Sequence, residues 1–158
     1  LAMQEEFGSS IIIGAGTVTK VSEVNNLSGL GCQMIVSPNT DKDVIKATKD
    51  KGMLSFPGVL TPSECFSAIN SGADALKIFP AFKLGIDGFK AMKAVLPSDV
   101  KTYGVGGIDE NHFHEWLLAG LTGFGIGSNL FHPSMNDDDI KTKAKKIVIE
   151  YDSWFAQR

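Results

Sequence analysis

The stretch Ala75-Leu76-Lys77-Ile78-Phe79-Pro80 is an apolar run that contains one charged residue and ends at a proline. Apart from Lys77, this composition is typical of a buried strand. Burial disfavours the ammonium form of a lysine, and the neutral amine is a nucleophile toward carbonyl carbon. The alternative interpretation, for the lysine alone, is that its side chain reaches solvent at the strand end or pairs with a carboxylate.

Five further short apolar or β-branched runs alternate with helical segments at intervals of about twenty residues. The six runs are 11–18, 34–37, 53–56, 75–79, 102–105 and 124–126. This alternation predicts a parallel sheet, either doubly wound or closed as a barrel. A dinucleotide-binding fold is disfavoured, because neither Gly14-Ala15-Gly16 nor Gly125-Ile126-Gly127 is followed by the third glycine of that fingerprint.

Polar and glycine residues stand at or just past the carboxyl end of every run, where a barrel builds its active site. They are Gly16-Thr17, Ser37-Pro38-Asn39, Pro57-Gly58, Lys77 with Phe79-Pro80, Gly106-Gly107 and Gly127-Ser128. We therefore expect a barrel and not a doubly wound sheet. In barrels the last two loops often bind phosphate through backbone N–H groups, which predicts a phosphate site at Gly106, Gly107, Gly127 and Ser128.

Helix starts carry their own signals. Thr61-Pro62-Ser63-Glu64 is a capping box with proline at the first helical position, and Asp41 and Asp109 are expected N-caps of helices at 42–51 and 110–119. Glu64 is assigned to its cap and not to catalysis. The last helix, at about 137–155, gathers its apolar residues on one face and leaves Lys141, Lys143, Lys145 and Lys146 on a solvated face.

Composition limits the class of function. The 158 residues, 43% of them hydrophobic, predict one globular domain over residues 1–158, and a net charge of -3 argues against nucleic acid or an anionic membrane as partner. Cys32 and Cys65 have no metal-binding spacing and are expected to be reduced thiols. No apolar run approaches a membrane span and the first residues do not resemble a signal peptide, so a cytoplasmic protein is expected. The three histidines, His112, His114 and His132, are not spaced to share a metal ion.

Taken together, the strand-end motifs resemble those of the 2-keto-3-deoxy-6-phosphogluconate (KDPG) and 6-phosphogalactonate (KDPGal) aldolases. The matching segments are Gly14-Ala15-Gly16-Thr17-Val18, Ser37-Pro38-Asn39, Phe56-Pro57-Gly58 with Thr61-Pro62-Ser63-Glu64, Ala75 to Pro80, Gly106-Gly107-Ile108 and Gly127-Ser128. They occur in order across essentially the whole chain.

The resemblance implies a (β/α)8 barrel and a class I aldolase that needs neither metal nor cofactor. The substrate would be a 2-keto-3-deoxy-6-phospho sugar acid, cleaved to pyruvate and glyceraldehyde 3-phosphate. Lys77 would form the Schiff base, Thr17 and Pro38 would bind the pyruvyl end, and Phe79 would flank the imine. The family further implies a homotrimer. A close family activity is cleavage of 4-hydroxy-2-oxoglutarate, which carries a carboxylate in place of phosphate.

The chain departs from this family at its beginning. It has about six βα units, and the family's first two strands, which carry a glutamate base and substrate-binding arginines, have no counterpart in it. Its only arginine is Arg158, and its seven glutamates all fall on expected helices or their first turns. Residues 1–7 are typical of the second half of a helix, so we expect a partial copy of a longer aldolase. The alternatives are a phosphate-binding or scaffold barrel with a vestigial site, and a phosphate-binding barrel of other chemistry, such as thiamine phosphate synthesis.

Overall fold

The computed structural model describes residues 2–156, which form short parallel strands joined by helices. The strands are β1 (Gly14–Gly16), β2 (Met34–Val36), β3 (Leu54–Phe56), β4 (Gly58–Val59), β5 (Leu76–Ile78), β6 (Thr102–Val105) and β7 (Gly123–Gly125). The helices are α1 (Ala2–Phe7), α2 (Val21–Gly29), α3 (Lys42–Asp50), α4 (Pro62–Asn70), α5 (Ala81–Lys93), α6 (Phe113–Leu118) and α7 (Asp137–Ala156), with 3-10 turns η1 (Gly8–Ser10) and η2 (Glu110–His112). Each of the six predicted runs therefore overlaps a strand, and five of them contain it; β7 begins one residue before its run.

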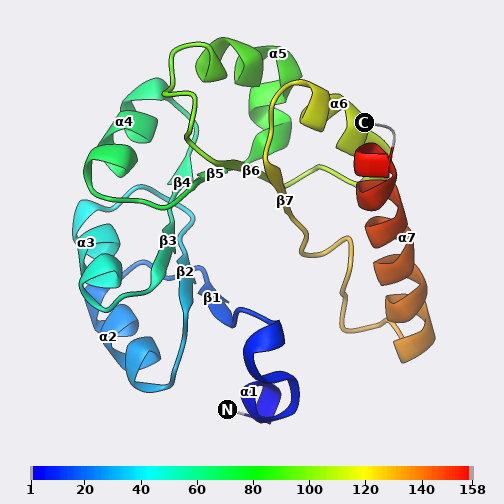
Figure 1. Ribbon diagram of the computed structural model, residues 1–158, viewed down its shortest axis with the longest axis horizontal. Coiled ribbons are helices and arrows are strands. Elements are labelled where there is room, and N and C mark those ends of the chain that lie inside the picture. The colour runs from blue at the N-terminus through cyan, green and yellow to red at the C-terminus, as the bar shows by residue number, and fades with distance from the viewer. Residues whose placement is uncertain (1, 157–158) are drawn as a thin grey trace.

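The strands follow one another along an arc, with α2 to α7 on its outer side (Figure 1). Pairing is parallel throughout, in the orders β1-β2-β3 and β4-β5-β6-β7. No ladder within residues 2–156 joins β1 to β7, so the arc is open between them. Because all strands run in one direction, their carboxyl ends lie at the same edge of the arc.

One predicted strand end was wrong. Pro57-Gly58 does not terminate its strand, because Gly58–Val59 continues it as β4. The segment changes neighbours at Pro57: the Ser37 N–H donates to the Phe56 carbonyl at 3.1 Å, and the Lys77 N–H donates to the Pro57 carbonyl at 2.9 Å. Proline has no N–H to donate, which suits a residue at the junction of two ladders.

Helix starts are largely as expected. The Asp41 carboxylate accepts from the N–H groups of Asp43 and Val44, at 2.9 and 3.0 Å. In the capping box, Glu64 accepts from the Thr61 N–H at 2.9 Å, while the Thr61 hydroxyl accepts from the Glu64 N–H at 3.3 Å. Hydrogen bonds from backbone N–H groups, the one from Leu60 foremost, lower the pKa of Glu64, so its predicted role as a cap is confirmed.

The helix expected at 110–119 is shorter. Asp109 caps it, accepting from the Asn111 N–H at 2.9 Å, but the first turn is the 3-10 turn η2 and the α-helix covers only Phe113–Leu118. Phe113 and Trp116 on this helix are buried. A tight first turn of this kind is common at helix N-termini.

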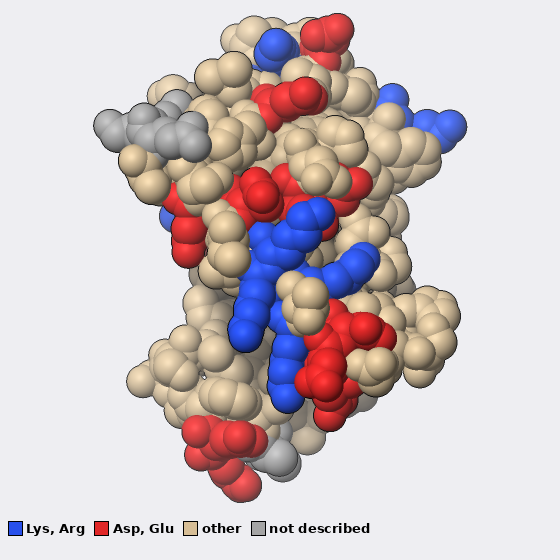
Figure 2. All heavy atoms as spheres, turned by 90° about the vertical axis from the view of Figure 1, so that its right-hand side faces the viewer, with Lys and Arg blue, Asp and Glu red and all other residues tan. Residues whose placement is uncertain are grey.

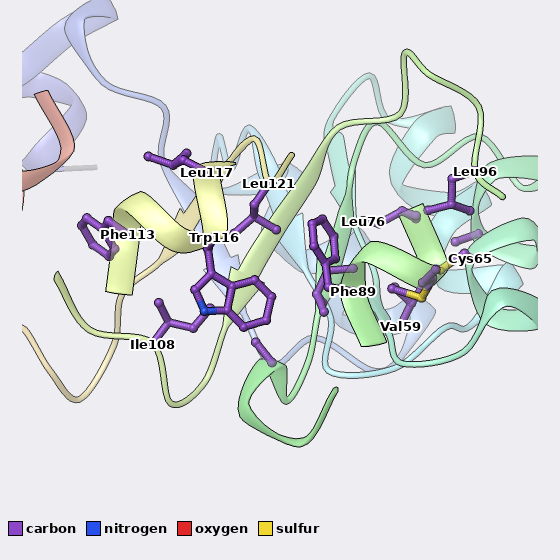
Figure 3. Close-up of a cluster of buried hydrophobic side chains, with 14 of the residues drawn as sticks. Val59, Cys65, Leu76, Phe89, Leu96, Ile108, Phe113, Trp116, Leu117 and Leu121 are labelled. Carbon is purple, nitrogen blue, oxygen red and sulfur yellow. The ribbon is translucent and has the colours of Figure 1, made fainter. Parts of the chain in front are cut away.

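The core lies between the strands and the outer helices. In its larger part, Leu76 and Ile78 of β5 pack with Phe89 of α5 and Trp116 of α6, and the Phe89 and Trp116 rings lie 5.7 Å apart (Figure 3). A smaller cluster, centred on Val24, Ile35 and Val44, packs β1 to β3 against α2 and α3. This outer packing fixes which residues of each strand face the inside of the arc.

Helix α7 packs against the end of the sheet through its predicted apolar face. Ile147, Tyr151 and Trp154 contact the larger core cluster. The predicted solvated face is also confirmed: Lys141, Lys143, Lys145 and Lys146 are exposed. Figure 2 shows lysines gathered on this side of the molecule between groups of acidic residues, and the Lys146 ammonium pairs with Glu110 at 2.8 Å.

Among residues 2–156, no helix has the length and hydropathy of a membrane span. The same part of the chain contains no group of three or more His, Cys, Asp or Glu side chains arranged for a metal ion. Cys32 and Cys65 are both free, and burial raises the pKa of the Cys65 thiol to about 11.

We expect Gly58→Ala to lower the free energy of unfolding by about 1–3 kcal/mol, the usual cost of overpacking. A Cβ at Gly58 would collide with the carbonyl of Pro38 and lie 2.9 Å from the Asn39 nitrogen, so the two chain segments would have to separate. Urea unfolding of the two proteins measures the difference. Gly29→Ala is the matched control, because a Cβ there meets nothing within 4 Å. Equal stability of Gly58→Ala and wild type would contradict the close packing of these segments.

Candidate functional site

Lys77 lies in the middle of β5 and points to the inner side of the arc. Its neighbours Leu76 and Ile78 are buried against the outer helices, and strand alternation places Lys77 on the opposite face. Lys77 is itself only partly exposed. The predicted strand is confirmed, but Lys77 lies in its middle and not at its carboxyl end, where the sequence pattern placed it.

The amine of Lys77 lies 4.2 Å from the centre of the Phe79 ring. No ion pair or hydrogen bond of its side chain to another residue occurs in the described part of the chain. Because burial strips water from the ammonium without supplying a counter-charge, it lowers the pKa of Lys77 below the ordinary 10.5. The alternative interpretation from the sequence, pairing with a carboxylate, does not apply within residues 2–156.

Lys77 lines a cavity of about 450 Å³ on the inner side of the arc. Most of the lining is apolar, and half of it comes from alternate positions of β2, β3 and β6. The lining residues are Ile12, Met34, Val36, Leu54, Phe56, Asp74, Lys77, Lys101, Tyr103, Val105, Phe124 and Gly125. The rings of Phe56, on β3, and Tyr103, on β6, approach to 5.2 Å.

Two other charged residues line the cavity, and both stand before the amino ends of strands. Asp74 precedes β5 and Lys101 precedes β6. The Asp74 carboxylate accepts from the Lys49 ammonium at 2.7 Å and from the Ser55 N–H at 2.7 Å. Asp74 therefore has a structural role at the far end of the strands from the loops that carry Phe79 and the glycine pairs.

The two predicted glycine loops lie at the carboxyl ends of the paired strands β6 and β7. Gly106 and Gly107 have φ of +89° and +73°, a backbone path that favours glycine. A Cβ on Gly106 would lie 3.5 Å from the Phe79 ring, so this loop adjoins the residue that contacts the Lys77 amine. Gly127 and Ser128 are exposed at the end of β7.

Of the predicted site residues, only Lys77 is in the lining of this cavity; Thr17 and Pro38, like Phe79 and the glycine loops, stand at the carboxyl edge of the arc outside that lining. Thr17 is exposed and lines a separate hollow beside α2 with Glu23 and Asn26. Its φ of +61° is the one positive value among the described non-glycine residues. The backbone carbonyl of Pro38 lies directly against Gly58.

Sequence reasoning missed the apolar lining of the cavity, above all Phe56 and Tyr103. Alternation along the strands would have placed both residues on the inner face with Lys77. It also missed Asn129, whose side-chain amide donates to the Ile108 carbonyl at 3.1 Å and joins the two glycine loops.

The expected location of the glutamates is confirmed: each of Glu5, Glu6, Glu23, Glu64, Glu110, Glu115 and Glu150 lies on a helix or 3-10 turn. Arg158 falls outside the described residues.

Known proteins share this fold and resemble the chain in sequence. A family model described as KDPG and KHG aldolase matches residues 2–146. The probable 2-dehydro-3-deoxy-6-phosphogalactonate aldolase of Rhizobium meliloti (strain 1021) is 41% identical over 90% of the chain and 67% of its own length. The 2-dehydro-3-deoxy-6-phosphogalactonate aldolase of Escherichia coli (strain K12) is 40% identical over 95% of the chain and 73% of its length. A native KDPGal structure superposes with a TM-score of 0.95 at 39% identity, covering 98% of this chain and 75% of that one.

We expect the rate at which Lys77 is acylated by acetic anhydride to rise with a midpoint below pH 10.5, because only the neutral amine reacts and burial lowers its pKa. Mass spectrometry of proteolytic peptides follows the modification of each lysine over a pH series. The midpoint reports the pKa independently of how freely the reagent reaches the amine. A midpoint at or above 10.5 would show that the amine is solvated or paired.

Proposed function

The chain belongs to the KDPG and KHG aldolase family, whose barrel fold it shares, and we propose that it acts as a class I aldolase with Lys77 as its Schiff-base residue. The substrate class would be a 2-keto-3-deoxy-6-phospho sugar acid, and the products pyruvate and glyceraldehyde 3-phosphate. The observation that carries the proposal is the partly buried Lys77 amine, which has no counter-charge in the described chain and lines a cavity of about 450 Å³.

The chemistry follows from a neutral amine. Lys77 Nζ attacks the C2 ketone of the substrate, and loss of water leaves a protonated imine. This imine accepts the electron pair of the C3–C4 bond as that bond breaks, while the C4 hydroxyl loses its proton and becomes the aldehyde. The enamine then takes a proton at C3, and water releases pyruvate from the lysine. No metal or cofactor enters any step.

Phe79 would hold the imine in place. Its ring already lies 4.2 Å from the amine, and a flat ring can pack against the planar imine and exclude water from it. Thr17 and Pro38, at the carboxyl ends of β1 and β2, would bind the carboxylate end of the keto acid. The proposal for Thr17 is supported by its positive φ, since strained backbone is retained at functional sites more often than elsewhere.

The far end of the substrate would lie at Gly106, Gly107, Gly127 and Ser128. Glycines allow backbone N–H groups to approach a phosphate closely, and the Ser128 hydroxyl would donate a further hydrogen bond to it. The Phe79 ring lies 3.5 Å from the position that a Cβ on Gly106 would take, and this proximity supports one continuous site from amine to phosphate. A galactonate derivative is the favoured substrate, because relatives at 40–41% identity are named for it, whereas those named for the gluconate derivative are 28–34% identical.

Removal of the C4 hydroxyl proton needs a base, and the described residues offer no free carboxylate near Lys77. Asp74 is the carboxylate that lines the cavity, and it is bound to Lys49 and Ser55. The second candidate is a phosphate-ligand-binding or scaffold barrel with a vestigial aldolase site, which would form the imine but turn over slowly. Loss of a general base typically lowers the rate by a factor of about 10²–10⁴.

A homotrimer is proposed on the family resemblance alone.

Incubation with pyruvate and sodium borohydride is expected to give a reduced adduct on Lys77, found by mass spectrometry of peptides. Lys77→Met should abolish the adduct. Lys101→Met is the matched control, because Lys101 lines the same cavity at the opposite strand end and should not be needed. A second assay measures cleavage of 2-keto-3-deoxy-6-phosphogalactonate, and the two results together separate the candidates. An adduct with cleavage supports the aldolase, and an adduct without cleavage supports the phosphate-ligand-binding barrel. No adduct at Lys77 would defeat both.

A further inference from the structure

The two glycine loops are held together by a side chain and not by the sheet. The ladder between β6 and β7 ends at the pair Val105 and Gly125. Beyond that level, within the described chain, no backbone hydrogen bond joins residues 106–109 to residues 126–130. The one direct hydrogen bond between these segments runs from Asn129 Nδ2 to the Ile108 carbonyl, at 3.1 Å.

Each loop is braced on its own side. The Gly106 carbonyl accepts from the Phe82 N–H at 3.1 Å, and the Phe82 side chain covers Gly107 so closely that a Cβ there would lie 2.6 Å from it. In the other loop, the Gly127 carbonyl accepts from the N–H groups of Leu130 and Phe131, at 2.9 and 3.1 Å. These bonds fix the shape of each loop but not the distance between them.

We propose that Asn129 is a positioning residue that sets the separation of the two glycine loops, and that it thereby selects phosphate over carboxylate at the far end of the substrate. The inference rests on the proposed function, because it assigns the phosphate end to these loops. Ile108, which receives the bond, is buried at 5% exposure and is therefore a firm anchor. Asn129 is partly buried, which limits competition from water for the same carbonyl.

The selectivity follows from the shapes of the two anions. A phosphate monoester is tetrahedral and presents three terminal oxygens in different directions, so donors from both loops can reach it together. A carboxylate is planar with two oxygens, and the donors of one loop can satisfy it. A fixed spacing between the loops therefore benefits the phosphate more than the carboxylate.

The test compares wild type with Asn129→Ala, using glycerol 3-phosphate as the phosphate probe and glutarate as the carboxylate probe in isothermal titration calorimetry. Loss of one neutral hydrogen bond predicts about a five- to tenfold weaker glycerol 3-phosphate affinity. Glutarate affinity and the yield of the pyruvate–borohydride adduct on Lys77 should stay unchanged, which also shows that the variant is folded. Asn129→Gln, which keeps the amide donor on a longer arm, should recover part of the affinity.

Asn70→Ala is the control, because Asn70 is an exposed asparagine at the end of α4, away from both loops. Equal glycerol 3-phosphate affinity in Asn129→Ala and wild type would overturn the inference and leave the proposed aldolase intact. An equal loss for both probes would also overturn it, since selectivity would be absent. If wild type itself binds no glycerol 3-phosphate although pyruvate is trapped on Lys77, the proposed phosphate end fails and the inference fails with it.

Discussion

The removal of water from one lysine amine is the constraint on which the rest of the site depends. Leu76 and Ile78, at 1% and 0% exposure, anchor β5 in the core on the outer side of the arc. A shift of β5 by one residue would bury the lysine among the helices and turn both apolar residues toward the cavity. The core therefore holds the amine where it is partly desolvated. The favourable burial of Leu76 and Ile78 offsets the free energy that this desolvation costs.

One short segment connects the two ends of the site. Phe79 contacts the Lys77 amine and lies beside Gly106, while the Phe82 N–H binds the Gly106 carbonyl. The segment from β5 to the first turn of α5 thus touches both the proposed imine and the first glycine loop. Because Leu76, Ile78 and Ala81 are fully packed, this connection stands on a rigid base and not on a mobile loop.

The sequence allowed prediction of what depends on local pattern. Six of the seven strands, the caps at Asp41 and Thr61 and the packing face of α7 follow from periodicity and capping chemistry. The change of neighbouring strands at Pro57 could not be predicted in this way, because which strands pair depends on the whole sheet. Asn129 was missed for the same reason: its partner Ile108 is 21 residues away, and a side-chain bond between two loops leaves no period in the sequence.

Thr17 shows how a strained residue can carry functional information. A non-glycine residue at a φ of +61° costs about 1–2 kcal/mol relative to glycine. The preceding residue, Gly16, has no positive φ, so the chain places glycine next to the strained position and not in it. No hydrogen bond of the Thr17 side chain to the described residues compensates the strain. A threonine held in this conformation without such a bond supports a role for its hydroxyl toward a ligand, at the same sheet edge as the residues proposed to bind the substrate.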